Sequence, residues 1–571
     1  MQPEMVQAAA GDDPQLVDKN NTQPLHAGCS HSSSMGANGM DDPYSKSRSC
    51  VAKNRKVILI GAAIFTLAAV SALVAVVATR PWMAKDKQNE ARQGPGIHNA
   101  TINNGTNTNG TSSDSPDRFT QSSSIPISSY VQCNAYTPPL NKPFPYGQQP
   151  IRGVNLGGWL VLEPFITPSV FEPYISQGVT DEYSLTKLLG PEKARAYLRK
   201  HYSEWVTEDT FRHIRDLGLN HVRIPLGFWA LGNLEDDEPY VSDLSLDFLL
   251  QGLKWAAMYG IRVMVELHAA PGSQNGWNHS GRGGKIGWLD GTPEGTKNGK
   301  RTLAYLKQLW MLLQGPGMEH VSPMFGILNE PAIFMLERDT TDKWYKEAFA
   351  ELRATTGGAG KGPWGVLHDG FLGLTQWEGF MHGADRLALD VHQYLIFDHD
   401  LIRMSQKEQV NFSCDVWAPN MQRSTLKFGP TLVGEFSSAT NDCATYLNGV
   451  GIGYRWDGTF LNENGVAEEA ACQQAKRGAT STSCSCAEQN NVDSFTPEYR
   501  KFLTDFTQTQ MDAFEQGMGW FYWNFKTENN ALWSYFDGVN QGWIPKDANN
   551  RPGGCKALGH AITPLEASTL Q

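Results

Sequence analysis

The chain has few basic residues for its length. Its 48 Lys and Arg are outnumbered by 59 Asp and Glu, which gives a formal net charge of -11 and an isoelectric point near 5.7. A protein that binds phosphate backbones needs an excess of positive charge on one face. This composition therefore argues against nucleic acid as a partner.

Two common ligand motifs are missing. The stretch Gly153-Val-Asn-Leu-Gly-Gly158 does not match the GxGxxG loop that a doubly wound nucleotide-binding sheet places after its first strand. The pair Cys484-Ser-Cys486 has no second Cys/His pair at ligand spacing, which argues against a zinc site. We therefore rank an open nucleotide-binding sheet below other folds and expect no metal.

Long apolar runs are rare, but residues 57–79 form one of 23 residues without a charge. A helix of that length spans the ~30 Å hydrocarbon core of a bilayer. A buried core helix would normally contain polar positions, and a signal peptide would begin near residue 1 rather than after 56 residues. We predict a transmembrane signal-anchor helix over residues 57–79, which makes the lipid bilayer a partner of the chain.

Basic residues and glycosylation sequons indicate the orientation of this helix. Five basic residues precede it closely, which places the N-terminus in the cytoplasm by the positive-inside rule. One sequon, at Asn20, precedes the helix, and the others follow it at Asn99, Asn104, Asn109, Asn278 and Asn411. We expect a single-pass type II protein of the plasma membrane, with its C-terminal part outside and with glycans at Asn99, Asn104, Asn109 and Asn411.

Composition divides the rest of the chain. Residues 1–56 are polar without apolar periodicity, so we expect a disordered cytoplasmic tail. Residues 80–138 read as a stalk, because 13 of the 31 positions from 99 to 129 are Ser or Thr. From residue 139 the composition becomes globular, and we assign residues 139–571 to a catalytic domain.

Nine cysteines are present, and seven of them follow the apolar run. Cys29 and Cys50 precede it and should be reduced. Seven is an odd number, so at least one thiol is free or pairs between chains. Spacing alone leaves the connectivity open.

Short apolar runs alternate with helical patterns over the globular part, which indicates repeated βα units. Eight candidate strands occur at 151–156, 221–225, 262–267, 324–328, 365–367, 387–391, 431–433 and 519–523. Candidate helices between them occur at 207–217, 244–259, 300–313, 341–354 and 497–516. Eight alternations predict a (β/α)8 TIM barrel of the α/β class with long insertions.

Polar residues recur at the carboxyl ends of these strands, where barrels hold their active sites. Glu330 ends the fourth strand and Glu435 ends the seventh. Glycoside hydrolysis needs two carboxyl groups that flank one bond, and a retaining enzyme holds them ~5–5.5 Å apart. We predict Glu330 as the general acid/base and Glu435 as the nucleophile. Two carboxyl groups supply both proton transfer and nucleophile, so no cofactor is expected.

The other strand ends supply candidate supporting groups. Arg223 could keep Glu435 ionised, and Tyr394 could hydrogen-bond the same carboxylate. Asn329 could bind the sugar 2-OH, an interaction that strengthens in the transition state.

Three further side chains complete this predicted site. His268 and His392 would orient neighbouring groups or bind hydroxyls, and Trp523 would form the floor of the subsite for the cleaved sugar. Each residue alone is compatible with a structural role. The joint spacing across six strands is what favours a site.

About residues 140–560 resemble glycoside hydrolase family 5 and, within it, fungal exo-β-1,3-glucanases. The resemblance is carried in order by RGVNLGGWLVLEPFITPSVFEPY (152–174), LGLNHVRIPLGFWA (217–230), ELHAAPGSQNGWNHSG (266–281), GILNEPA (326–332), DVHQYLIFD (390–398), LVGEFSSATNDCATYLNGVGIGYRWDGTF (432–460) and GWFYWNFKTE (519–528). It implies the roles given above for Glu330 and Glu435, and sugar binding by the supporting residues.

The resemblance also implies roles that the residues alone do not suggest. Glu163 matches a glutamate that holds the terminal glucose, and Trp277 and Phe397 match an aromatic pair that clamps the next sugar. The family usually has Phe where this chain has Trp277, so the leaving-group subsite is expected to differ. A glycan on Asn278 would obstruct this clamp, so we expect that sequon to be empty.

The family usually has two disulfides. The resemblance implies a bond between Cys414 and Cys555, and a bond from Cys443 to Cys472, Cys484 or Cys486. The cysteine-rich segment 470–491 does not align cleanly with the family.

The expected function is release of glucose from the non-reducing ends of β-1,3-glucan with retention, in cell wall remodelling by a monomer. Transglycosylation is an alternative, because a sugar hydroxyl can intercept the same covalent intermediate. A non-catalytic glucan-binding surface protein is another, although it would be expected to have lost a catalytic glutamate or the arginine. An endo-acting enzyme would require an open cleft, whereas the resemblance around Glu163 implies a closed pocket.

Overall fold

Eight parallel strands close into a barrel in which neighbours in sequence are neighbours in space and β8 pairs with β1. The strands are β1 (Ile151–Asn155), β2 (His221–Gly227), β3 (Arg262–Ala269), β4 (Met324–Gly326), β5 (Trp364–His368), β6 (Leu387–Gln393), β7 (Thr431–Phe436) and β8 (Gly519–Tyr522). The computed structural model describes Ile125 and residues 131–462, 465–474 and 484–562. All eight predicted strands are present, and the predicted (β/α)8 barrel is confirmed.

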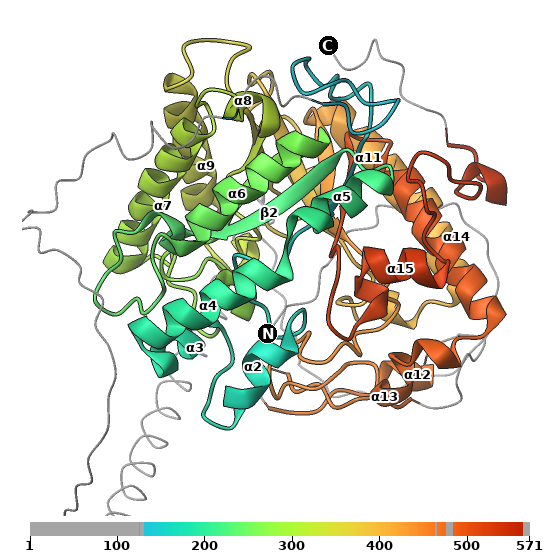
Figure 1. Cartoon of the computed structure of the whole chain (residues 1–571). Coiled ribbons are helices and arrows are strands. Elements are labelled where there is room, and N and C mark those ends of the chain that lie inside the picture. The colour runs from blue at the N-terminus through green and yellow to red at the C-terminus, as the bar shows by residue number, and fades with distance from the viewer. Residues whose placement is uncertain (1–124, 126–130, 463–464, 475–483, 563–571) are drawn as a thin grey trace, which may run out of the picture. The chain divides into compact units, whose positions relative to one another are not determined.

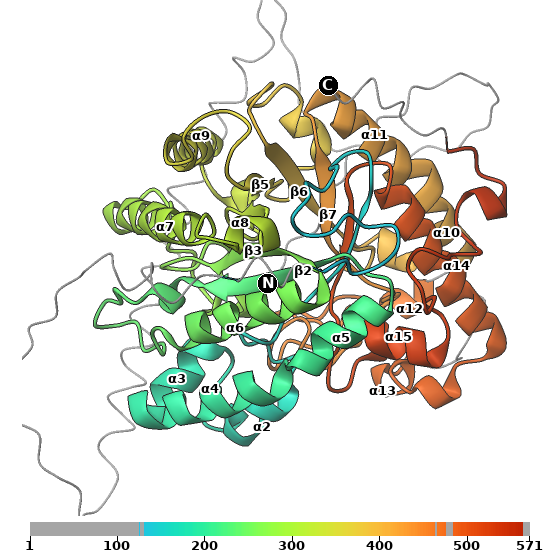
Figure 2. The same ribbon diagram turned by 45° about the horizontal axis from the view of Figure 1, so that its top comes forward.

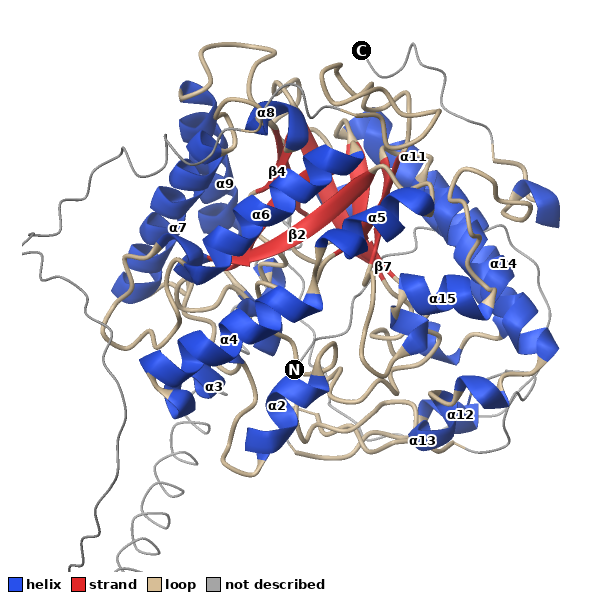
Figure 3. Cartoon of the chain, in the orientation of Figure 1, coloured by secondary structure: helices blue, strands red, loops and turns tan. Residues whose placement is uncertain are grey.

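Helices surround this barrel (Figures 1 and 3). They are α2 (Pro168–Ile175), α3 (Glu182–Leu189), α4 (Pro191–Trp205), α5 (Glu208–Asp216), α6 (Leu244–Tyr259), α7 (Pro293–Leu312), α8 (Met318–Val321), α9 (Arg338–Ala354), α10 (Gln406–Phe412), α11 (Ala418–Lys427), α12 (Ala471–Gln474), α13 (Cys486–Gln489), α14 (Pro497–Phe514) and α15 (Tyr535–Gln541). The five predicted helices correspond to α5, α6, α7, α9 and α14. The short helices α2, α12 and α13 lie on one side of the molecule, at the bottom of Figure 1.

Local sequence signals explain where several helices begin and end. A capping box fixes the start of α3, because the Asp181 side chain accepts a hydrogen bond from the Ser184 backbone N–H and the Ser184 hydroxyl accepts one from the Asp181 backbone N–H. Proline occupies the first turn of α4, α7 and α14, where its missing N–H costs nothing. Gly260 ends α6 with a φ of +71°, a conformation that glycine adopts freely.

Successive side chains of each strand point alternately into and out of the barrel, so the inward side chains form layers. On β3, Met264, Glu266 and His268 are two residues apart and so share one face. Met264 belongs to an apolar cluster that fills the amino end of the barrel, whereas Glu266 and His268 lie nearer the carboxyl end. The other members of this cluster are Phe144, Ile151, Met324, Val366, Ala388, Leu432, Met518 and Phe521. The apolar floor leaves the carboxyl end of the interior for polar groups.

The segment before the first strand packs against the amino end of the barrel. Cys133 is buried, and the Arg262 guanidinium donates to the carbonyl oxygens of Pro138, Pro139 and Lys142. The view of Figure 2 shows the blue start of the described chain beside the strands. The packed part of the chain thus includes residues 131–138, which the Ser/Thr-rich composition assigned to the stalk. Their few apolar side chains give no periodic signal from which this packing could be predicted.

The helices within the described ranges are all too short or too polar to cross a bilayer. The predicted anchor at 57–79 and the predicted tail at 1–56 lie outside those ranges.

A partly buried ion cluster joins the two ends of the barrel domain. Glu515, which directly follows α14, accepts hydrogen bonds from Arg152 on β1 and from Arg551 near the C-terminus, at 2.8 and 2.7 Å. Burial opposes the charge of Glu515, but the two guanidinium groups outweigh it and lower the pKa of Glu515 to about 2. Arg551 also pairs with Asp512 at 3.0 Å, so three distant segments depend on this cluster.

Replacement of Glu515 by Gln should lower the free energy of unfolding at pH 7 by about 3 kcal/mol, because two partly buried guanidinium groups lose their charged partner. Since the folded pKa lies below the unfolded value, this stability is present above pH ~4 and is lost as pH falls towards 2. Chemical denaturation of the two proteins between pH 2.5 and 7 measures both effects. Glu294→Gln, on the exposed face of α7, is the control and should cost less than about 0.5 kcal/mol. Equal stability of Glu515→Gln and wild type would contradict this account.

Candidate active site

Arg223 on β2 lies at the centre of the polar layer and is fully buried. Its guanidinium donates to Glu435 Oε1 at 2.9 Å and to the Glu266 carboxylate at 2.6 Å. It also donates to the side-chain oxygens of Asn155 and Asn329, both at 2.7 Å. Five strand ends are therefore connected through one cation.

The Glu435 carboxylate is held from two sides at the end of β7. Arg223 binds Oε1, and the Tyr394 hydroxyl donates to Oε2 at 3.1 Å. Gly434 donates its N–H to Asp390 at 2.6 Å, and a β-carbon at Gly434 would collide with that carboxylate. Glycine at this position thus allows β6 and β7 to approach closely beside Glu435.

Glu330 lies in the turn after β4 with a φ of +44°, a left-handed conformation that non-glycine residues rarely adopt. Its Oε1 lies 2.6 Å from His392 Nδ1, and its Oε2 lies 3.3 Å from His279 Nε2. A strained backbone at a functional side chain persists only where its surroundings hold it in place.

The loop after β3 provides that support. The Asn275 side chain donates to the carbonyl oxygen of Glu330 at 3.0 Å, and the Gln274 side chain donates to that of Asn329 at 2.9 Å. Sequence reasoning did not single out Gln274, Asn275 or His279. All three lie inside the stretch 266–281 that carries the resemblance, but only a structure shows that they face Glu330.

One imidazole nitrogen connects the two glutamates. His392 Nδ1 lies 2.6 Å from Glu330 Oε1 and 3.5 Å from Glu435 Oε2. These two carboxylate oxygens are therefore closer together than the ~6.5 Å at which inverting pairs begin. This bound is compatible with the shorter spacing of a retaining pair.

Burial and neighbouring charges give the two carboxyl groups different pKa values. Burial and then the charge of Glu435 raise the pKa of Glu330 well above its usual range. Burial also raises the pKa of Glu435, to about 7, but Arg223 and Tyr394 oppose the rise. Since Glu330 is the weaker acid, it holds the proton while Glu435 is ionised, which is the distribution that acid-assisted attack needs.

Three histidines around the glutamates are neutral, because burial lowers the pKa of His268, His279 and His392. A neutral His392 accepts the Glu330 proton at Nδ1 and directs Nε2 towards Asp390, 3.5 Å away. His268 approaches Glu266 at 3.1 Å. The imidazoles thus orient carboxyl groups without adding charge.

A pocket opens above this layer. The pocket is lined by Glu163, Phe165, His268, Asn278, His279, Glu330, Tyr394, Phe397, Glu435, Leu447, Trp523 and Trp533. Trp523 stacks on the His268 ring with an interplanar angle of 5°. Arg223 and Asn329 are fully buried behind this lining. Arg223 donates to Glu435, and the Asn329 side chain contacts Arg223 and His268 rather than the open pocket.

Glu163, in the loop after β1, enters the pocket with an unsatisfied acceptor. Its Oε1 is buried and has no hydrogen-bond partner among the described residues. Burial, and then the charge of Glu435, raises the pKa of Glu163 well above its usual range. A buried acceptor without a partner requires an explanation, and a ligand hydroxyl would satisfy it.

The two aromatic residues expected to form a clamp lie on different hollows. Phe397 lines the pocket and packs on Tyr394 with ring centroids 5.4 Å apart. Trp277 lines a neighbouring hollow and packs on Phe371 at 5.3 Å.

Glu330, His368 and His392 offer ligand atoms within 4.8 Å of one another, a spacing that a metal ion could bridge. His368 Nδ1 accepts the N–H of Gly370, and His392 Nδ1 is bonded to Glu330. A cation would hold Glu330 ionised and so remove the proton that glycoside cleavage needs.

Three disulfides lie within the described residues. Cys414 pairs with Cys555, as the resemblance implied, and Cys443 pairs with Cys486. The third bond, between Cys472 and Cys484, was not expected from the family. Cys133 is the free cysteine of the described part and is buried, in keeping with the odd number of thiols.

Two predicted sequons can be placed. Asn411 lies half-buried in α10, and Asn278 lines the pocket, while the hydroxyl of Ser280 in the same sequon is bonded to the Trp277 carbonyl oxygen. Asn99, Asn104 and Asn109 lie outside the described residues, as do Cys29 and Cys50.

Comparisons with known proteins agree with this geometry. Residues 189–468 match the family described as Cellulase (glycosyl hydrolase family 5). The chain is 44% identical over 420 residues to a probable glucan 1,3-beta-glucosidase D of Aspergillus clavatus and 41% identical over 424 residues to that of Aspergillus niger. Each match covers 73% of this chain and 49% of the relative, so the chain spans about half the length of these relatives.

A solved structure, rutinosidase from Aspergillus niger, matches with a TM-score of 0.51 and 18% identity over 69% of this chain and 98% of that chain. That likeness shows the barrel fold. The barrel, the paired carboxyl groups and the matched family together define a glycoside hydrolase domain. The match to glycosyl hydrolase family 5 extends over residues 189–468.

Tyr394→Phe should move the acidic limb of the kcat/KM profile upward by about one pH unit. The Tyr394 hydroxyl stabilises the ionised form of Glu435, so its loss raises the pKa of that carboxyl. Hydrolysis of an aryl β-glucoside as a function of pH measures this limb for the free enzyme. Tyr136→Phe, at an exposed position, is the control. An unchanged acidic limb in Tyr394→Phe would show that the bond does not act on the group that titrates.

Proposed function

We propose that this chain is a retaining, exo-acting β-glucan glucosidase. The observation that carries the proposal is the placement of Glu330 and Glu435 around His392 Nδ1. Of these two carboxyl groups, Glu435 is the one that the structure pairs with Arg223. This arrangement supplies one protonated and one ionised carboxyl group at the short separation that double displacement requires.

In the first step, Glu435 attacks the anomeric carbon and forms a glycosyl-enzyme ester. Glu330 gives its proton to the leaving oxygen as the glycosidic bond breaks. In the second step, Glu330 takes a proton from water, the water attacks the same carbon, and Glu435 leaves as a carboxylate. Tyr394 and Arg223 stabilise that carboxylate in both steps.

Glu163 and Phe165 support exo action, because both come from the loop after β1 and line the pocket beside the catalytic pair. The unpartnered Glu163 oxygen suits a hydroxyl of a terminal glucose. The names of the relatives support β-1,3-linked glucan as the substrate.

Transfer to a sugar acceptor is a second candidate, favoured by the aromatic hollow beside the pocket that contains Trp277. A purely glucan-binding role has less support, because the two glutamates and Arg223 are all in place.

We also propose that residues 57–79 anchor the protein in the plasma membrane as a type II protein and that its barrel acts on the cell wall side. The uncharged run of 23 residues and the sequons that follow it support this arrangement.

The first product of β-1,3-glucan hydrolysis should be β-glucose, because two inversions restore the original configuration. Proton NMR during the first minutes distinguishes the anomers before mutarotation. Glu435→Gln and Glu330→Gln should each lower kcat by at least about 10³-fold. Asp400→Asn, 92% exposed on the surface, is the matched control. Initial α-glucose, or near-normal activity of Glu435→Gln, would contradict the assigned roles.

The full chain, expressed in yeast, should remain with membranes after alkaline carbonate extraction. Deletion of residues 57–79 should move it to the soluble fraction, because the uncharged run is the part that can enter the bilayer. Replacement of Asn99, Asn104 and Asn109 by Gln should change electrophoretic mobility but not fractionation. Recovery of the full chain in the cytosol without glycans would overturn the proposed topology.

A further inference from the structure

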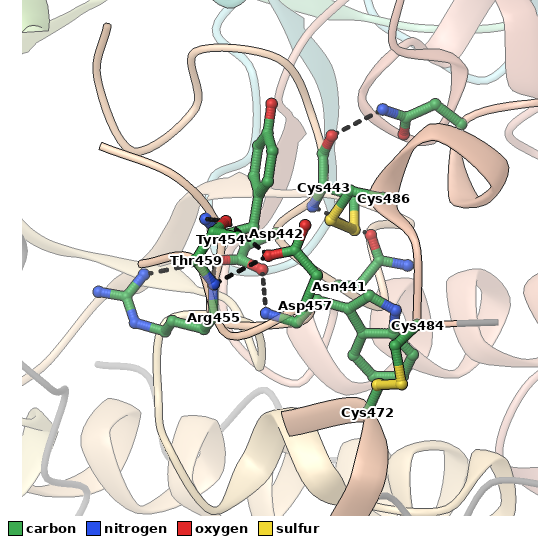
Figure 4. The surroundings of a disulfide bond; sticks show 12 residues. Asn441, Asp442, Cys443, Tyr454, Arg455, Asp457, Thr459, Cys472, Cys484 and Cys486 are labelled. Atoms are coloured by element: carbon green, nitrogen blue, oxygen red, sulfur yellow. Dashed lines mark hydrogen bonds and ion pairs between the residues drawn. A yellow bond between two sulfur atoms is a disulfide. The ribbon is translucent and has the colours of Figure 1, made fainter. Parts of the chain in front are cut away.

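Asp442 lies in the segment after β7 and is completely buried, apart from the catalytic layer. Its carboxylate accepts the backbone N–H of Arg455 at 2.7 Å and that of Trp456 at 2.9 Å (Figure 4). The side chain of Asn448 donates to the same carboxylate at 2.9 Å. Burial raises the pKa of Asp442, and these donors oppose the rise. A buried carboxyl group that gathers several donors orders the chain around it.

Asp442 joins the two ends of a loop, residues 443–454, because it binds the backbone where the loop returns. These residues, all of them described, form neither helix nor strand. Within the loop, Gly449, Gly451 and Gly453 have positive φ, and so does Tyr446 at +64°. A tyrosine keeps that conformation only where its surroundings hold it in place. The shape of the loop therefore depends on bonds made by side chains.

Asn448 makes the central bonds of this loop. Its amide nitrogen donates to Asp442 and to the Gly453 carbonyl oxygen, both at 2.9 Å. Its amide oxygen accepts from the Arg455 guanidinium, also at 2.9 Å. The preceding residue, Leu447, lines the catalytic pocket. Because the two residues share a peptide bond, the groups that hold Asn448 also place Leu447.

A disulfide attaches the start of the loop to its surroundings. Cys443, which directly follows Asp442, pairs with Cys486 at the start of α13 (Figure 4). Asn490, directly after α13, donates its side-chain N–H to the Cys443 carbonyl oxygen at 2.7 Å. The loop is thus attached at its first residue and joined at its two ends by Asp442.

We propose that Asp442 is a positioning residue for the catalytic pocket, because through Asn448 it holds Leu447 in the wall that contacts the terminal sugar. Leu447 shares this pocket with Glu330 and Glu435, and an apolar side chain can pack on the C–H groups of a sugar ring. Asp442 does not itself line the described pocket, so it acts on binding rather than on the chemical step. The inference rests on the proposed function and adds a residue that sets its affinity for sugar.

Asp442→Asn should raise KM for an aryl β-glucoside about 3- to 10-fold and change kcat by less than about 2-fold. A displaced Leu447 removes binding that the substrate and the transition state share. Leu447→Ala should raise KM about 10-fold. Since Asp442 acts through Leu447, the double variant should match Leu447→Ala within about 2-fold. Independent, multiplying effects in the double variant would overturn this route.

Two further variants complete the kinetic test. Asn448→Ala breaks the same connection at its other end and should raise KM by a similar factor, even where Asp442→Asn folds poorly. Asp457→Asn is the matched control, because Asp457 accepts the Thr459 N–H in the same segment but does not line the pocket. An unchanged KM in Asn448→Ala, or an equal rise in Asp457→Asn, would overturn the positioning role.

Hydrogen exchange measures the positioning without any substrate. In Asp442→Asn, the backbone amides of residues 443–454 should exchange at least about 10-fold faster than in wild type, because the loop loses the bonds that join its ends. In Asp457→Asn their exchange should be unchanged. Equal exchange of these amides in Asp442→Asn and wild type would show that Asp442 does not hold the loop.

Calorimetry with the β-1,3-linked glucose disaccharide separates this role from the proposed reaction. The full-length Glu435→Gln variant should bind the disaccharide, and adding Asp442→Asn should weaken binding about 3- to 10-fold. If wild type cleaves no β-glucoside but binding still depends on Asp442, the proposed reaction is wrong and the positioning role stands. If wild type cleaves the aryl β-glucoside but neither KM nor binding depends on Asp442, the positioning role is wrong and the reaction stands.

Discussion

The site depends on one buried cation. Arg223 is fully buried, yet the carboxylates of Glu266 and Glu435 outweigh burial and raise its pKa, so it stays charged. An ion cluster of this kind gains little over apolar packing, because removing charges from water costs several kcal/mol. In the proposed reaction, its role is to keep Glu435 ionised while Glu330 holds the proton. Without Arg223, the two glutamates would compete for the same proton.

The second constraint is the turn that carries Glu330. A φ of +44° costs free energy at a glutamate, and the loop after β3 offsets that cost through Gln274 and Asn275. The same loop supplies His279 to the acid and Trp277 to the neighbouring hollow. Substitutions in this loop would therefore affect acid geometry and leaving-group binding together, although none of its residues performs the chemistry.

Strand positions and the polar residues at strand ends could be predicted from the sequence, because a period of two and a run of buried residues are local signals. Arg223, Tyr394 and Glu435 were brought together as expected for residues at the carboxyl ends of barrel strands. Contacts within loops could not be predicted in this way. In the sequence, His279 is only the middle residue of a glycosylation sequon, and its contact with Glu330 becomes visible in the fold. The spacing of Cys472 and Cys484 likewise does not predict that they pair with each other.

In the proposed reaction, the leaving-group side of the site also bears on the balance between hydrolysis and transfer. After the first step, Glu330 would become the base, and the group it activates must enter from the side that the leaving sugar has just vacated. His279 lies 3.3 Å from Glu330 Oε2, and its ring is 5.4 Å from the ring of Trp277. A sugar that stays beside Trp277 would therefore place a hydroxyl near Glu330, whereas water reaches that position freely only when this side is empty. Acceptors that stay there longer would favour transfer, and products that leave quickly would allow hydrolysis.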